Sequence, residues 1–109
     1  MASAYKVLGQ LSSTTSATAL YTCPSATEAV VSTLIICNRA SSSKTYRIIL
    51  RPNDETLADK HYLAYDISIA ANDTTALTLG ITMDASDKLY VSGSDTNLSF
   101  TAFGSEITA

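Results

Sequence analysis

The sequence predicts an all-β protein: a single antiparallel β-sandwich, jelly-roll-like, with about eight strands. Three observations carry this prediction. Hydrophobicity alternates with a period of two, turn residues interrupt the chain about every 8–12 residues, and no long segment has helical spacing. The chain has 109 residues, of which 46% are hydrophobic. We therefore expect one domain, residues 1–109, with one packed core.

Eight segments have the pattern of strands. In chain order they are residues 5–11, 19–23, 29–38, 45–51, 61–70, 75–79, 88–91 and 98–102. The alternation is clearest in residues 61–70, where we expect Leu63, Tyr65, Ile67 and Ile69 on the buried face. The first two segments have the weakest pattern.

Turn-forming residues separate these segments. Residues 39–44 and 71–73 are short enough for hairpin turns, and Gly93 tolerates a positive φ. Residues 53–60 have the composition of one helical turn, which we expect Asn53 to cap. The breaks therefore have the chemistry that a sandwich of short strands needs.

The segment 29–38 departs from the alternation, because apolar residues occupy both faces. Val31, Ile35 and Cys37 stand at odd positions, and Val30, Leu34 and Ile36 at even ones. An apolar outer face needs a cover, which is either another subunit or a loop of the same chain; a misread register is the third explanation. Ile49 and Phe103 also have the wrong parity for their strands. The residues predicted to contact a partner are Val30, Leu34, Ile36, Ile49 and Phe103.

The composition points to a polar surface made of hydroxyls rather than charges. Serine and threonine contribute 15 residues each, whereas only 16% of the residues are charged. A hydroxyl leaves water at a lower cost than a charge, which favours a surface that is partly buried in an assembly. The net charge of −3 provides no basic stripe for nucleic acid. The longest apolar stretch, residues 29–37, is too short for a membrane helix of about 20 residues, and no signal peptide is expected.

Cofactor chemistry has little support in the sequence. Cys23, Cys37 and the single histidine, His61, cannot provide a tetrahedral zinc site from Cys and His alone. The two cysteines are predicted to be small buried residues, with a disulfide as the alternative. The acidic residues Asp54, Glu55 and Asp59 do not have the spacing of a calcium loop, and Asp84 and Asp87 are typical of a turn. We expect no metal or other cofactor.

Catalysis has equally little support. His61 has serines and aspartates nearby, but 30 hydroxyl residues make that proximity uninformative, and no Gly-x-Ser-x-Gly turn is present. We therefore expect a non-enzymatic protein. Tyr62 and Tyr90 are the candidates for a sugar-stacking platform, although tyrosines are also ordinary core and edge residues of β-domains.

Six segments of the chain carry a family resemblance: "AYKVLGQ" (4–10), "AVVSTLIICNR" (29–39), "TYRIILRP" (45–52), "DKHYLAYD" (59–66), "NDTTALTLGITM" (72–83) and "LSFTAFGSEI" (98–107). They resemble small virion structural proteins of tailed bacteriophages, particularly those that infect cyanobacteria. They cover most of the chain, and none is a catalytic or ligand signature. No functional residue is carried over from the family.

The resemblance implies a decoration or appendage subunit of the virion, synthesised in the host cytoplasm. Such a subunit is present in repeated copies on a symmetric particle, often as trimers, and contacts its own copies and other virion proteins. The expected function is therefore structural, on the capsid, neck or tail fibre. The alternative is a module at the tip of a tail fibre that binds host-surface carbohydrate through Tyr62 and Tyr90.

Overall fold

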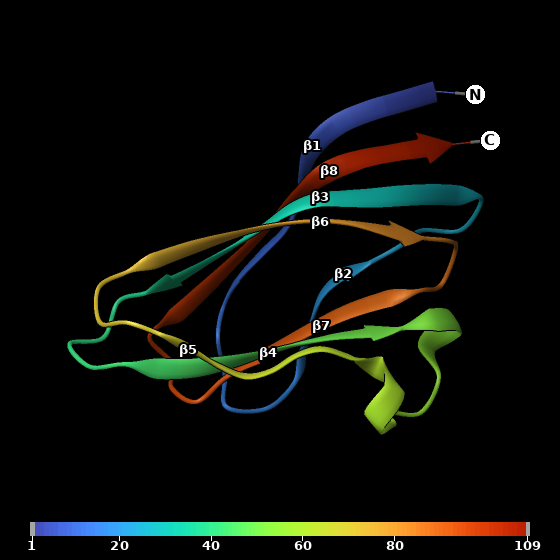
Figure 1. Ribbon diagram of the computed structural model, residues 1–109. Helices are drawn as coiled ribbons and strands as arrows, with labels where there is room; N and C mark the ends of the chain where they lie inside the picture. Colours follow the sequence, from blue (N-terminus) through green and yellow to red (C-terminus); the bar gives the residue numbers. More distant parts are fainter. Residues whose placement is uncertain (1, 109) are drawn as a thin grey trace.

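The computed structural model describes residues 2–108 and contains two four-stranded antiparallel sheets packed face to face (Figure 1). This arrangement confirms the predicted antiparallel β-sandwich. The strands are β1 (Ala2–Ser12), β2 (Thr18–Thr22), β3 (Thr27–Asn38), β4 (Lys44–Arg51), β5 (Tyr62–Ile69), β6 (Thr74–Met83), β7 (Lys88–Gly93) and β8 (Leu98–Thr108).

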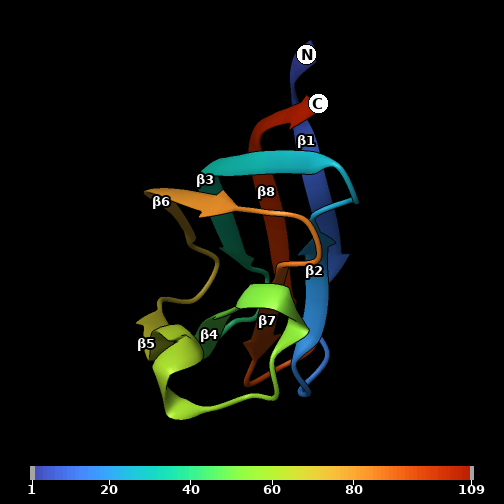
Figure 2. The same ribbon diagram turned by 90° about the vertical axis from the view of Figure 1, so that its right-hand side faces the viewer.

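The strand order is that of a jelly roll. One sheet has the order β1-β8-β3-β6 and the other β2-β7-β4-β5. The first strand therefore pairs with the last, the second with the seventh, the third with the sixth and the fourth with the fifth. A long hairpin rolled into two layers gives this pairing. Figure 2 shows β5 and β6 along one side of the sandwich and β1 and β2 along the other.

The core lies between the two sheets and consists of the inward residues of both. Leu34, Ile36 and Phe100 of the first sheet and Ile48 and Leu89 of the second are completely buried. Burial of each such side chain contributes roughly 1.5–3 kcal/mol relative to exposure. Alternation along the strands, as predicted, is what places these residues on one side.

A bulge in β3 changes which residues of this strand face the core. The register against β8 shifts between Val31 and Thr33, so Ser32 is an extra residue on β3. Before the bulge, Ala29 and Val31 point inward; after it, Leu34 and Ile36 do. The prediction that Leu34 and Ile36 face a partner is therefore wrong, because the parity of the strand changes at Ser32.

Two irregularities in β5 overturn the predicted buried face of this strand. Its register against β4 shifts twice, and Asp66 has a φ of 52°. As a result Leu63, Tyr65 and Ile67 are 49%, 54% and 45% exposed, and only Ile69 of the predicted set is buried. β5 is an edge strand, where bulges are common and limit pairing with other chains.

The connection between β4 and β5 contains two short 3-10 turns rather than one capped helical turn. They are Pro52–Asp54 and Asp59–His61, and the residues at their N-caps are Arg51 and Ala58. Asn53 lies inside the first turn with a φ of 53°, so the prediction that it caps a helix is wrong.

Glycine is required where β8 passes under the bulge of β3. A Cβ atom on Gly104 would overlap the carbonyl oxygen of Val30, which is backbone and cannot move aside. The bulge of β3 therefore depends on this residue of its neighbour.

Candidate interaction surfaces

The five residues predicted to contact a partner do not form one surface. Leu34 and Ile36 lie in the core, as described above. Val30 and Phe103 are half-buried on the outer face of the β1-β8-β3-β6 sheet. Ile49 points outward from the opposite sheet but is only 2% exposed. A misread register therefore explains Leu34 and Ile36, and residues of the same chain bury Ile49.

The chain's own tyrosines cover Ile49. Tyr62 of β5 and Tyr90 of β7 stand opposite Ile49 on its two sides. Residues paired in this way project from the same face, within side-chain contact. The parity of Ile49 was predicted correctly, but no partner is needed to bury it.

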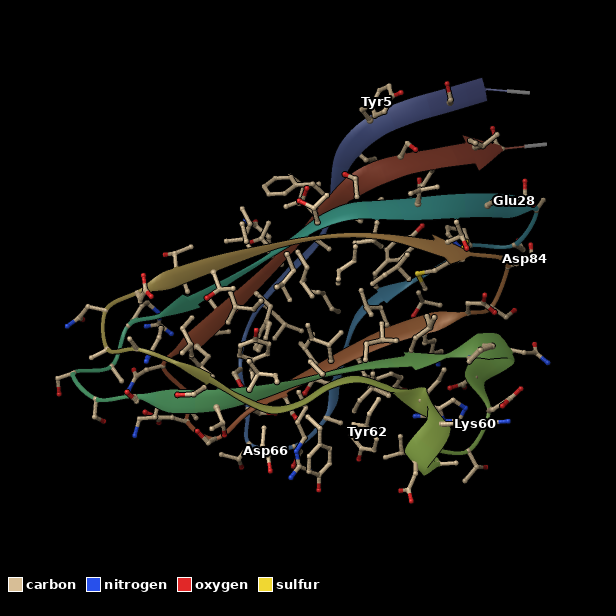
Figure 3. The ribbon with its side chains drawn as sticks, viewed as in Figure 1. Tyr5, Glu28, Lys60, Tyr62, Asp66 and Asp84 are labelled. Atoms are coloured by element: carbon tan, nitrogen blue, oxygen red, sulfur yellow. The ribbon has the colours of Figure 1, made fainter. Side chains whose placement is uncertain are left out.

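These tyrosines belong to a polar and aromatic surface on the β2-β7-β4-β5 sheet, which we call the tyrosine face. Its members are Arg47, Ile49, Arg51, Tyr62, Tyr65, Asp66 and Tyr90. The Arg47 guanidinium carbon lies 4.0 Å from the centre of the Tyr65 ring, and that of Arg51 lies 4.7 Å from the centre of the Tyr90 ring. The Tyr62 and Tyr65 rings meet edge to face, with centres 4.9 Å apart. Figure 3 shows Tyr62 and Asp66 on this side of the molecule.

The ion pair between Arg47 and Asp66 lies at one end of the tyrosine face. Arg47 donates two hydrogen bonds to the carboxylate of Asp66, at 2.7 and 3.2 Å, and they lower the pKa of Asp66. A pocket of about 210 Å³ lies beside the pair, and its lining includes Thr45, Ser92 and Ser94. This volume is below the roughly 300 Å³ at which ordinary small-molecule sites begin. Tyr62 and Tyr90 do not line the pocket, so the predicted sugar contacts are separate from it.

His61 lies within the β4–β5 connection, where it lines a pocket of about 240 Å³ together with Leu50, Pro52, Glu55, Lys60 and Leu63. The side chain is 3% exposed, and its Nδ1 accepts a hydrogen bond from the Ala58 amide at 3.0 Å. The Nε2 nitrogen therefore carries the proton and donates to Glu55, at 3.2 Å. Both ring nitrogens are engaged within the connection, and this pairing lowers the pKa of Glu55.

Two of the three acidic residues of this connection, Asp54 and Glu55, form ion pairs with neighbouring cations, whereas Asp59 forms none among the described residues. Asp54 contacts Arg51 at 3.4 Å and Lys88 at 3.2 Å, while Glu55 contacts Lys60 at 3.5 Å. Within residues 2–108, no three His, Cys, Asp or Glu side chains are grouped so that they could hold a metal ion.

Asp84 and Asp87 form a turn, as predicted. The Asp87 amide donates to the Asp84 carbonyl, and the Asp87 carboxylate accepts from the Asp84 amide. These hydrogen bonds therefore stabilise the turn that connects β6 and β7.

The two cysteines are free and lie on different sides of the structure. Cys23 is 1% exposed and belongs to the core, as predicted. Cys37 is half-buried on the outer side of β3, because the bulge places Ile36 and Asn38 inward. The alternative prediction, a disulfide between Cys23 and Cys37, is therefore wrong.

The outer face of the β1-β8-β3-β6 sheet has no charged residue in its central part, and we call this part the charge-free face. It contains four rows, each with one residue from each strand. The rows are Tyr5, Ser105, Val30, Thr82; Val7, Phe103, Thr33, Thr78; Gln10, Thr101, Ile35, Ala76; and Ser12, Ser99, Cys37, Thr74.

Large apolar side chains stand exposed on the charge-free face. Tyr5 is 91% and Val7 48% exposed, and Figure 3 shows Tyr5 projecting away from the sandwich. Ile35 and Phe103, in neighbouring strands, are half-buried. The remaining positions are mostly threonine and serine. This surface combines exposed apolar area with hydroxyls, so it loses little solvation free energy when water is excluded.

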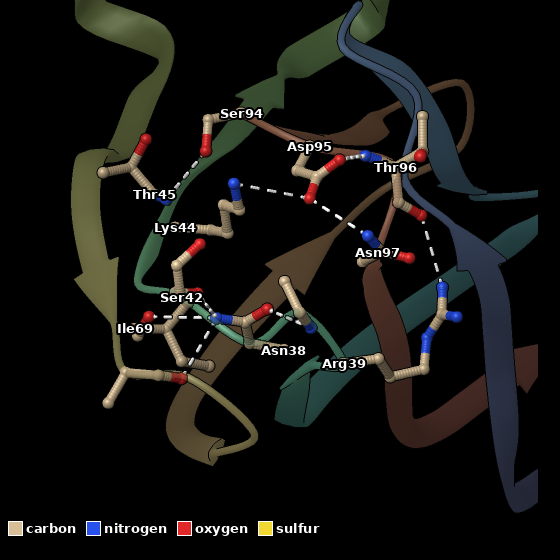
Figure 4. Close-up of polar contacts among 12 residues, drawn as sticks. Asn38, Arg39, Ser42, Lys44, Thr45, Ile69, Ser94, Asp95, Thr96 and Asn97 are labelled. Atoms are coloured by element: carbon tan, nitrogen blue, oxygen red, sulfur yellow. Dashed lines mark hydrogen bonds and ion pairs between the residues drawn. The ribbon is translucent and has the colours of Figure 1, made fainter.

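Opposite charges mark the two ends of the charge-free face. At one end, Glu28, Asp84 and Asp87 line a groove of about 450 Å³. Figure 3 shows Glu28 and Asp84 at this end of the sandwich. At the other end, Arg39 donates to the hydroxyls of Ser12 and Ser99. It also donates to the Thr96 carbonyl (Figure 4).

Arg39 is exceptional among the cations of the chain. The chain has seven Lys and Arg residues, and six of them form ion pairs: Lys6, Lys44, Arg47, Arg51, Lys60 and Lys88. Among residues 2–108, Arg39 is the one without an acidic partner, and Glu28 also forms no ion pair there.

No helix among the described residues is long and apolar enough to cross a membrane. Comparisons with protein-family models, with curated proteins and with solved structures give no match for this chain. The sheets and their surfaces are therefore the basis for inferring a function.

Proposed function

We propose that the chain is a non-enzymatic structural protein of a tailed-phage virion, a small subunit that oligomerises or docks on the particle. The observation that carries the proposal is the charge-free face, on which Tyr5 and Val7 are 91% and 48% exposed. Contiguous exposed apolar surface of this kind marks sites of protein contact. The capsid, the neck and the tail fibre are the candidate positions.

Two further observations support the proposal. Jelly rolls form many viral capsid domains, although they also form lectins and cupins, so the fold argues by analogy only. The segments that resemble phage virion proteins include β3 and β8, which are the two central strands of the charge-free face.

The test is the incorporation of variants into particles. In phage that carry Val7→Asp, we expect the purified particles to contain several-fold less of this chain than wild-type particles contain, measured by quantitative mass spectrometry. Leu63→Asp is the matched control, because Leu63 is 49% exposed but lies on the other sheet. Absence of the wild-type chain from purified particles would refute the proposal.

A second candidate function is recognition of host-surface carbohydrate by the tyrosine face. The observation in its favour is that Tyr62 and Tyr90 share this face with Tyr65, which is 54% exposed and stacks on Arg47, a residue that lines the pocket. Aromatic rings beside polar groups suit a sugar, which has an apolar side and a hydroxylated rim. On a glycan array, this function predicts hits that Tyr65→Ala abolishes, whereas an array without hits would exclude it.

A further inference from the structure

We propose that the charge-free face binds a second copy of the same chain, in a two-fold dimer whose axis runs across the strands through the row of Val7, Phe103 and Thr33. The inference deepens the proposed function by naming a partner and its surface. It rests on that function only for its role in the particle, because the dimer itself is a property of the isolated chain.

The positions of the charges select this symmetry. Glu28 and Arg39 lie at opposite ends of the charge-free face, eleven positions apart along β3 and its extension. A two-fold axis parallel to the strands would place like ends together, so that the acidic end of one copy lies over the acidic end of the other. A two-fold axis across the strands instead brings the Arg39 end of one copy over the acidic groove of the other, twice per dimer. Complementary charges of this kind fix orientation more than affinity.

The most apolar row lies near the middle of the charge-free face. In it Thr33 stands opposite Phe103, which in turn stands opposite Val7. Because Ser32 is an extra residue, Thr33 is four paired positions from Glu28 and six from Arg39, so an axis through this row places Glu28 of one copy over Cys37 of the other, two residues from Arg39. In the proposed dimer each of these residues meets its own copy. An aromatic side chain near the centre of an interface, with polar residues around it, is the usual arrangement of an energetic hot spot.

The size of the face is adequate for a weak dimer. With both charged ends included, four strands spaced about 4.8 Å apart, over about eleven residues of 3.3 Å each, span roughly 700 Å². Stable interfaces bury about 800 Å² per partner. The bulges bend the sheet, so roughly 700 Å² is an upper limit, and we expect a dissociation constant in the micromolar range.

The first experiment measures the mass of the purified chain by sedimentation equilibrium, with reductant present so that Cys37 cannot form a covalent dimer. At about 100 µM chain, well above micromolar dissociation constants, we expect twice the chain mass of 11.5 kDa. Val7→Asp places two carboxylates together at the axis and should weaken the dimer at least tenfold. Leu63→Asp adds the same charge at a position of equal exposure on the other sheet and should leave the mass unchanged.

The second experiment exchanges the charges at the ends. Glu28→Arg and Arg39→Glu should each weaken the dimer, and the double variant should restore it, because each new arginine then meets a new glutamate. Thermal melting by circular dichroism verifies that each variant folds. A monomeric or trimeric wild type, equal effects of Val7→Asp and Leu63→Asp, or a double variant weaker than both single variants would overturn the inference. A monomer whose incorporation into particles still depended on Val7 would refute the dimer and leave the proposed function in place.

Discussion

Ile49→Ala should strongly destabilise the protein, although Ile49 points away from the core between the sheets. Its side chain is 2% exposed because Tyr62 and Tyr90 stand on either side of it. Truncating a buried isoleucine to alanine costs about 3 kcal/mol, out of a total of roughly 5–15 kcal/mol for a domain of this size. With a slope of about 1.5 kcal/mol per molar urea, the urea midpoint should fall by about 2 M.

The assay is urea unfolding followed by far-ultraviolet circular dichroism. Leu63→Ala is the control, because Leu63 is on the neighbouring strand and 49% exposed, and its loss should cost less than about 1 kcal/mol. A midpoint for Ile49→Ala within about 0.3 M of the control would refute the reasoning, since Ile49 would then be accessible to solvent or to a partner.

Three further changes test other parts of the structure. Glu106 accepts hydrogen bonds from Tyr21 at 2.5 Å and from Lys6 at 2.6 Å, and these bonds lower its pKa. Its contribution, about 2 kcal/mol, is present above the ordinary glutamate pKa of about 4.3 and is lost as the pH falls below that value. Glu106→Gln should therefore show a shallower loss of unfolding free energy below this pH, and an unchanged pH profile would contradict the assignment. Gly104→Ala should fail to fold or lose several kcal/mol, because the new methyl group would overlap the Val30 carbonyl; an unchanged melting temperature would count against the bulge of β3. Asn38 is 1% exposed and donates to the carbonyls of Ser42, Ile69 and Ala70 (Figure 4), so Asn38→Ala should cost about 3 kcal/mol in urea unfolding, and a cost below about 1 kcal/mol would show that these carbonyls find other partners.

The period of two along the chain was sufficient to predict the fold class and the number of strands. It depends only on which residues are apolar, and a sandwich buries one face of each strand. The bulges were not predictable in the same way. Ser32 has no property that marks it as an extra residue, and its effect is to move Leu34 and Ile36 from the expected outer face to the core.

The candidate surfaces were predicted less well than the fold, because they depend on residues brought together from separate strands. The outward direction of Ile49 follows from its parity, but its cover comes from Tyr62 and Tyr90. The charge-free face includes Tyr5 and Val7, from the N-terminal segment whose pattern was among the weakest. A register between β1, β8 and β3 was needed before Val7, Phe103 and Thr33 could be recognised as one row.

Disulfide trapping tests most directly whether a second copy covers the charge-free face. In a Cys37→Ser background, Thr33→Cys places a thiol at the proposed two-fold axis, while Thr45→Cys places one at a half-buried outward position on the other sheet. After mild oxidation, Thr33→Cys should run on a non-reducing gel as a covalent dimer of twice 11.5 kDa, and Thr45→Cys as a monomer. Equal cross-linking of the two variants, or none in either, would contradict the account.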